Sequence, residues 1–150
     1  MNEMKVQRIE NGTVIDHITA GKALYIAQLL HLADSSLFVI GSNLQSSKLG
    51  KKDIIKIENY QLHEGEKKSI ALISPSASFT EIRNFKVVAK ETAELPEIIK
   101  ELIVCPNHNC ITNLEDMKSR FSLNARTMTL QCSYCEKKYT IDEVKFKRQI

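Results

Sequence analysis

Four cysteines are the residues of this sequence whose type and spacing most directly point to chemistry. They form two close pairs, in "CPNHNC" (105–110) and "CSYC" (132–135), with twenty-one residues between the pairs and no cysteine elsewhere. Two loops that each present two thiolates can surround one metal ion tetrahedrally, as in structural zinc sites. The spacing therefore predicts one structural Zn²⁺ site with four ligands: Cys105, Cys110, Cys132 and Cys135.

Other uses of the same cysteines are less well supported. Two disulfides need an oxidising compartment, but the polar N-terminus "MNEMKVQRIENG" lacks the apolar segment of a secretory signal. A thioredoxin-like motif opens a helix after a strand, whereas "CSYC" follows "MTLQ" and leads to "EKKYT". A Cys₃His site using His108 and an iron–sulfur cluster stay open as alternatives. Four sulfurs leave no free coordination position, so we expect a structural metal.

Three lysines beside apolar strands form a second candidate site. In an extended "KDIIK", Lys52 and Lys56 share one face of the strand, and the alternate residues 53, 55 and 57 share the other. Lys90 follows a neighbouring strand-like run, "KVVA". Ammonium groups gathered in this way would suit a polyphosphate, and Asp16 in "GTVIDHI" could bind a ribose or a base. From spacing alone, solvated lysines and a half-buried His17 are the commoner explanation of such a pattern, and no P-loop, GxGxxG or Ser/His/Asp arrangement is present.

The elements that must position these residues alternate between strand and helix patterns. A helix at 19–34 would start with Thr19 as N-cap, and "EGEKKSIALI" (64–73) reads as a second helix. Strands are expected at 5–9, 36–44, 53–62 and, as one long or two consecutive strands, 78–90. The order β-α-β-β-α-β predicts an α+β fold, a ferredoxin-like antiparallel sheet with two helices on one face.

A change of composition predicts two domains. The acidic, proline-containing segment "ETAELPEIIKE" (91–101) reads as a connector, so we expect domains at 1–95 and 96–150. The second domain has short alternating runs such as "RFSLN" and "MTLQC". About fifty residues of this kind bury little core, so a metal would have to stabilise a small zinc-ribbon β domain.

Composition excludes several classes of function. Apolar residues make up 43% and charged residues 26% of the 150 residues, with a formal charge of +3, which is typical of a folded soluble protein. No apolar run approaches the ~20 residues of a membrane span, and we expect a cytoplasmic protein. Residues 96–150 carry nine Lys or Arg against seven Asp or Glu, which does not form the basic stripe of a nucleic-acid binder.

Six motifs in order resemble the regulatory chain of aspartate carbamoyltransferase: "GTVIDHI", "GKKDIIKIEN", "KVVAK", "LPEII", "VCPNHNC" and "CSYCEKKY". The resemblance extends from about Val6 to Tyr139. It implies a chain without catalytic activity whose allosteric domain pairs with a second copy and binds ATP, CTP and UTP. It also implies a zinc domain that docks on the catalytic chains of pyrimidine biosynthesis, with inhibition by CTP and UTP and activation by ATP.

The resemblance also implies roles for individual residues. Thr80 and Phe85 depart from the family pattern, standing where its best-known members have asparagine and tyrosine. The cysteines named above match the zinc ligands one for one. The residues that match the effector site, for the base, the ribose and the triphosphate, are Ile9, Asp16, His17, Lys52, Lys56, Val87 and Lys90.

Overall fold

A five-stranded antiparallel sheet forms the centre of the first of two units in this chain. The computed structural model describes residues 8–147, and the contacts divide the chain between Glu94 and Leu95. The strand order of the first sheet is β2-β3-β1-β4-β5, in which the first four strands have the ferredoxin-like order and β5 adds an edge. Its strands are β1 (Gly12–Thr19), β2 (Phe38–Ser46), β3 (Gly50–Glu58), β4 (Ser78–Arg83) and β5 (Lys86–Thr92).

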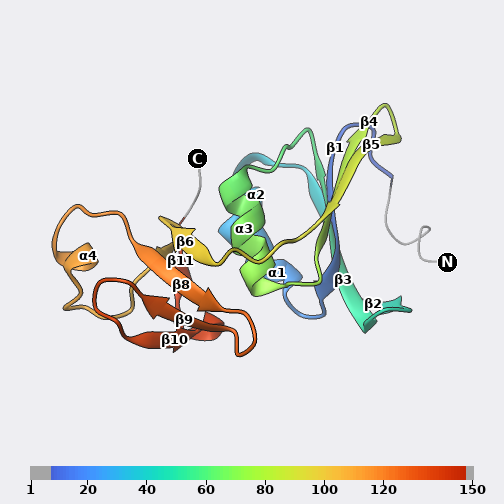
Figure 1. The fold of residues 1–150 in the computed structure, drawn as a ribbon. Helices are drawn as coiled ribbons and strands as arrows, with labels where there is room; N and C mark the ends of the chain where they lie inside the picture. The colour runs from blue at the N-terminus through green and yellow to red at the C-terminus, as the bar shows by residue number, and fades with distance from the viewer. Residues whose placement is uncertain (1–7, 148–150) are drawn as a thin grey trace. The chain divides into compact units, whose positions relative to one another are not determined.

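Three helices cover one face of this sheet (Figure 1). On the covered face, Ile15 of β1 and Ile55 and Ile57 of β3 are fully buried, and burying each such side chain stabilises the fold by about 1.5–3 kcal/mol. Ile26 of the first helix and Ile70 of the third helix are also fully buried and belong to the same core. The opposite face of the sheet is not covered by the helices of this unit. These helices are α1 (Ala23–Leu29), α2 (Leu32–Ser35) and α3 (Glu64–Ile73).

The predicted helix at 64–73 is confirmed, and the one at 19–34 is wrong in its boundaries. Helix α3 begins with a capping box, in which the His63 backbone N–H donates to the Glu66 carboxylate at 2.9 Å. Thr19 is not an N-cap, because it is the last residue of β1, and Lys22 precedes α1. His31 has a left-handed backbone, with φ 56°, and this interrupts the helical pattern between α1 and α2.

The predicted strands differ from the observed ones mainly at their ends. Most of the predicted strand 5–9 lies outside the described residues, and residues 8–9 are not in a strand; the first described strand is β1. The run 53–62 is strand only to Glu58, because β3 starts earlier, at Gly50. The run 78–90 forms two strands, β4 and β5. Asn84 and Phe85 connect them with φ of 52° and 65°, as a tight hairpin turn requires.

The second unit is a small β structure. Its four-stranded sheet has the order β10-β9-β8-β6, and β7 pairs with β11. Residues 98–100, which the sequence suggested as connector, form β6, where Ile99 lies opposite the fully buried Phe121. So few buried side chains make a metal centre the expected source of further stability. The elements are β6 (Ile98–Lys100), β7 (Ile103–Val104), α4 (Ile111–Leu114), β8 (Arg120–Asn124), β9 (Thr129–Cys132), β10 (Lys138–Thr140), the 3₁₀ turn η2 (Ile141–Glu143) and β11 (Lys145–Phe146).

None of the helices within residues 8–147 is both long enough and apolar enough to cross a membrane.

Candidate metal centre and ligand-binding face

The four cysteine sulfurs of the second unit lie within 4.8 Å of one another. The sulfurs of Cys105 and Cys135 are 3.7 Å apart, as are those of Cys110 and Cys132, so none is in a disulfide. A tetrahedral ion with metal–sulfur bonds of ~2.3 Å places its ligands about 3.8 Å apart. The cluster therefore has the size and the donor set of a closed, structural metal centre. His108 is exposed and outside this cluster.

Short backbone turns hold both cysteine pairs. At the second pair, the Glu136 N–H donates to the Cys132 carbonyl at 2.9 Å, and the positive φ of Glu136, 65°, lets the chain turn back. At the first pair, the Asn113 side-chain amide donates to the carbonyls of Cys105, at 2.7 Å, and Asn107, at 2.8 Å. Asn113 thus fixes the loop between the first two cysteines, a role that the cysteine spacing does not indicate.

Three of the cysteine thiols have a shifted pKa. Burial raises the pKa of Cys105 to about 12 and also raises the pKa of Cys132. Burial acts in the same direction on Cys135, but hydrogen bonds from the Lys137 backbone N–H and from Asn107 outweigh it and lower its pKa to about 7. Of these three thiols, Cys135 therefore forms a thiolate most readily, and a bound metal cation would favour the thiolate form of its ligands.

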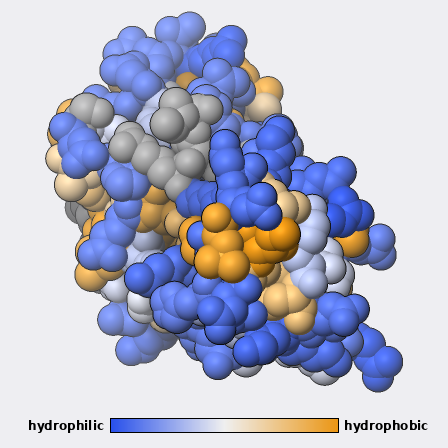
Figure 2. Space-filling view, turned by 90° about the vertical axis from the view of Figure 1, so that its left-hand side faces the viewer, coloured by the Kyte–Doolittle hydropathy of each residue, from blue (hydrophilic) through white to orange (hydrophobic). Residues whose placement is uncertain are grey.

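An apolar surface follows the first cysteine pair. On α4, Ile111 is 41% exposed and Leu114 is 68% exposed. Figure 2 shows an apolar patch framed by hydrophilic side chains, on the side where α4 lies in Figure 1. An exposed apolar patch with a polar rim is typical of a surface that binds another protein.

The uncovered face of the first sheet brings two of the predicted lysines into one row. Strand register places Lys56 opposite both Val39 and Val14, Val14 opposite Thr80, and Thr80 opposite Lys90. Residues directly opposite on neighbouring strands share a face, so these five side chains run across the sheet. Three strand spacings, about 14 Å, separate the backbones of Lys56 and Lys90. This span favours an elongated ligand over a single phosphate.

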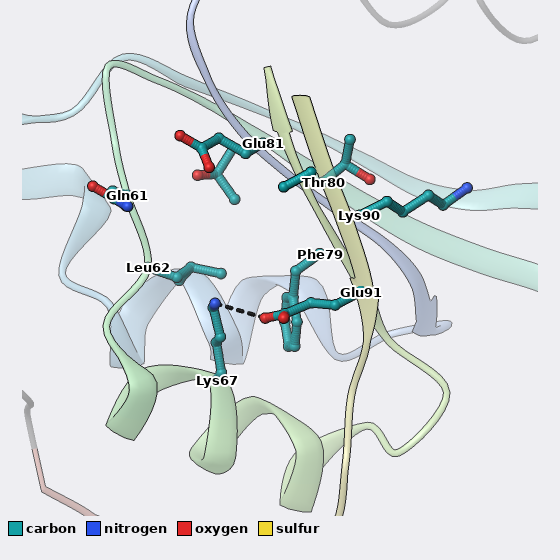
Figure 3. A pocket seen from close by; sticks show the side chains of 10 residues that line it. Gln61, Leu62, Lys67, Phe79, Thr80, Glu81, Lys90 and Glu91 are labelled. Carbon is teal, nitrogen blue, oxygen red and sulfur yellow. Dashed lines mark ion pairs between the residues drawn. The ribbon is translucent and has the colours of Figure 1, made fainter. Parts of the chain in front are cut away.

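Figure 3 shows where Lys90 points. A hollow on the helix-covered side lies between α3 and the strands, where Lys67 pairs with Glu91 at 2.6 Å. Lys90 and Thr80 border this hollow, but the Lys90 side chain extends away from Lys67 and Glu91. Its ammonium group is therefore available to the uncovered face.

Asp16, His17 and Lys52 come together at a bulge in β1. The register of β1 with β3 shifts between Ile15 and Ile18, so Asp16 and His17 are not paired with β3. The Lys52 ammonium lies 2.8 Å from the Asp16 carboxylate, which also accepts the His17 backbone N–H at 2.6 Å. Burial alone would raise the Asp16 pKa, but these hydrogen bonds outweigh it, and the pKa is lowered.

His17 has a left-handed backbone, with φ 56°, which the bulge requires. Its Nδ1 lies 3.0 Å from the Ser78 hydroxyl of β4. This contact connects the bulge to the strand that carries Thr80. Asp16 itself lies opposite Ser78 in the ladder between β1 and β4. Asp16, His17 and Ser78 therefore lie beside the row that runs from Lys56 to Lys90.

The two apolar residues of the predicted site differ in accessibility. Val87 lies opposite Ile82 on the uncovered face and is 61% exposed. Ile9 is buried, so its side chain has little surface to offer a ligand.

Sequence reasoning missed Asp53. This carboxylate is only 1% exposed, yet it accepts four hydrogen bonds, from the backbone N–H groups of Gly21, Ala23 and Asn43 and from the Ser42 hydroxyl. Asp53 thus joins the start of α1 to a bulge in β2, and it lies opposite Ile18 beside the β1 bulge. A buried aspartate in an apolar strand was the available signal, because such a group needs several donors.

The fold and these sites define a two-part protein: a sheet with an open, basic face and a separate small unit with a closed metal centre. Residues 4–94 match the family model of the aspartate carbamoyltransferase regulatory chain, allosteric domain. Residues 97–145 match the metal binding domain of the same regulatory chain.

Curated relatives agree over almost the whole length. The aspartate carbamoyltransferase regulatory chain of Thermococcus sibiricus is 44% identical over 138 residues, 91% of this chain and 92% of the relative. That of Methanocaldococcus jannaschii is 44% identical over 138 residues, which cover 91% of this chain and 93% of the relative. That of Pyrococcus horikoshii is 41% identical over 148 residues, 96% and 97% respectively. The chain belongs to the aspartate carbamoyltransferase regulatory chain family, with an allosteric domain, a metal-binding domain and no catalytic role of its own.

Proposed function

We propose that this chain senses nucleoside triphosphates on the uncovered face of its first sheet and transmits binding to aspartate carbamoyltransferase catalytic chains. CTP and UTP would inhibit and ATP would activate, as suits feedback control of pyrimidine biosynthesis. A chain of this kind works in the cytoplasm, where the four thiols stay reduced.

The row from Lys56 to Lys90 is the observation that carries this proposal. Two ammonium groups on one face suit a triphosphate, and a span of about 14 Å leaves room for a sugar and a base. Asp16 is held ionised beside the row by Lys52 and can accept a hydrogen bond from a ribose hydroxyl. Lys52, which pairs with Asp16, would then reach the same ligand. Both members of this ion pair would therefore contribute to the site.

The experiment is a calorimetric titration of the zinc-loaded chain with CTP, repeated in excess ATP. We expect saturable binding that ATP competes away. Lys90→Ala should weaken both nucleotides by about tenfold or more, since a charge-assisted contact to phosphate is lost. Lys86→Ala is the matched control. The register of β5 with β4 shifts between Glu81 and Ile82, so Val87 shares the face of Lys90, and the exposed Lys86 faces the other way. Equal effects of the two substitutions would argue against the site.

We further propose that the metal is zinc, since four thiolates at tetrahedral spacing suit this ion. Cys105, Cys110, Cys132 and Cys135 would be its ligands. The ion would stabilise the second unit, and the apolar surface at Ile111 and Leu114 would dock on the catalytic chain. This leaves the first domain, ending near residue 95, for nucleotides and for pairing with a second copy.

Pairing of two regulatory chains has support in the edge of the first sheet. Strand β2 is an edge strand, with unpaired backbone groups that could add to a neighbouring sheet. Leu37 is 66% exposed just before it. Light scattering of the purified zinc-loaded chain should give the mass of a dimer, and a monomer at working concentration would contradict the pairing.

A further inference from the structure

The uncovered face of the first sheet carries a row of lysines across its strands, and its surface changes from basic to apolar along the strands. Lys56 lies two residues before the end of β3, and Lys90 lies within β5. Towards the β4–β5 turn the surface becomes apolar, with Ile82, Val87 and Phe85, of which Phe85 is 52% exposed. If the lysines take the triphosphate, this apolar end is where the base of the same nucleotide would lie.

Arg8 lies at this apolar end. The Phe85 backbone N–H donates to the Glu10 carbonyl at 2.9 Å, and the Asn84 N–H donates to the Asn11 side chain at 3.1 Å, which ties the first described residues to the turn. Figure 1 shows the start of the described chain beside the β4–β5 turn. The Arg8 guanidinium carbon lies 5.6 Å from the centre of the Phe85 ring, within the range of a cation–π contact.

The cation–π contact with Phe85 holds the Arg8 guanidinium near the β4–β5 turn. A guanidinium is planar, and when one of its faces rests on an aromatic ring its N–H groups still point outward in the plane. Such a fork pairs best with adjacent acceptors that include a carbonyl oxygen, as in guanine. Adenine has no carbonyl oxygen, and its N7 acceptor is next to an amino donor.

We infer that Arg8 selects the base in this chain, favouring nucleoside triphosphates whose base has a carbonyl oxygen beside a ring-nitrogen acceptor over ATP and UTP. The inference rests on the proposed function and adds a specificity-determining residue to its site. Phe85 acts as a positioning residue, because it holds the guanidinium in place without itself reading the base. Cytosine presents such a pair of acceptors in O2 and N3, and guanine in O6 and N7, whereas uracil has an N3–H donor between its two carbonyl oxygens.

The test is calorimetric titration of the full zinc-loaded chain with CTP, UTP, GTP and ATP in turn. Arg8→Ala should raise the Kd of CTP and GTP by about tenfold and that of UTP and ATP by less than about threefold. Arg8→Lys keeps the charge but has no planar fork, so it should lose the base preference too. Arg83→Ala, in the same turn with its charge paired to Glu81 at 2.6 Å, is the control and should leave the preference unchanged.

Two results would overturn the inference. One is an equal change, or no change, in all four Kd values with Arg8→Ala; the other is a wild-type preference retained by Arg8→Lys. Failure of the proposed function has a different signature. In that case the unsubstituted chain binds none of the four nucleotides, or Lys90→Ala binds them as tightly as the unsubstituted chain does.

Discussion

Replacing Asp53 by alanine should unfold the part of the allosteric domain that shapes the ligand-binding face. The Asp53 carboxylate accepts the backbone N–H groups of Gly21 at 3.0 Å, Ala23 at 3.1 Å and Asn43 at 2.9 Å, and the Ser42 hydroxyl at 3.0 Å. The hydroxyl can rotate toward water when the carboxylate is gone. The three backbone donors cannot, because α1 and the β2 bulge fix them.

The size of the effect follows from these contacts. At roughly 1.5 kcal/mol for each hydrogen bond to a charged group, the three backbone donors correspond to about 4–5 kcal/mol of unfolding free energy. This is a large fraction of the ~5–15 kcal/mol typical of a domain. Ser42→Ala removes one hydrogen bond only and should cost about 1 kcal/mol. Asp34→Ala, at an exposed aspartate, should cost almost nothing.

Urea unfolding followed by circular dichroism measures the loss, and hydrogen exchange with mass spectrometry locates it. In Asp53→Ala, peptides covering residues 18–24 and 40–46 should lose protection, while peptides of the second unit serve as an internal reference. A loss below about 1 kcal/mol, or a loss of protection spread equally over both units, would refute the role assigned to Asp53.

Three further predictions concern the two sites. Lys52→Met should raise the pKa of Asp16, because burial then acts without the nearby ammonium group. In the unsubstituted chain the Asp16 pKa is lowered, so the stability from this ion pair is present above the ordinary aspartate pKa and is lost as the pH falls through the lowered pKa. Carbon-13 NMR titration of Asp16 measures the shift, and an unchanged titration would contradict this prediction. Cys132→Ser or chelation should unfold the second unit and leave exchange protection in the first unit unchanged; concerted loss in both would be the contrary result. Asn113→Ala should speed metal release to a chromogenic chelator by about tenfold with a similar circular dichroism spectrum, and an unchanged rate would show that its two carbonyl contacts do not hold the loop.

The regular helical and strand patterns of the sequence were sufficient to predict much of the fold. Helix α3 carries its own start signal, the capping box of His63 and Glu66, and its limits follow from the sequence. The face assignment in β3 is confirmed for the same reason: Ile55 and Ile57 are fully buried and Lys56 lies on the other side. A period of two is a property of the strand itself and needs no tertiary information.

The features that could not be predicted depend on contacts between distant segments. The bulge at Asp16 and His17 breaks the alternation of side chains along β1. The residue that pairs with Asp16, Lys52, comes from another strand. The position of Asp53 on the same strand face as Ile55 and Ile57 indicates a carboxylate that needs donors, but it does not indicate that they come from two other segments. The turn at His31 needs a left-handed backbone at a residue that is compatible with a helix.

The cysteine cluster lies between these cases. Spacing alone selected all four residues, because two tight pairs have few other uses. The S–S separations of 3.7 Å and the contacts of Asn113 come only from the folded chain.

The central claim is that nucleotide binding on the first unit changes the activity of catalytic chains bound to the second. The most direct measurement is the aspartate saturation curve of an aspartate carbamoyltransferase catalytic trimer reconstituted with this zinc-loaded chain, with and without CTP and ATP. An effector shifts the curve only if it binds two states of the assembly with different affinity. We predict that CTP moves half-saturation to higher aspartate, that ATP moves it to lower aspartate, and that Lys90→Ala abolishes both shifts. A curve unchanged by either nucleotide, in an assembly shown to contain this chain and to bind CTP, would contradict the account.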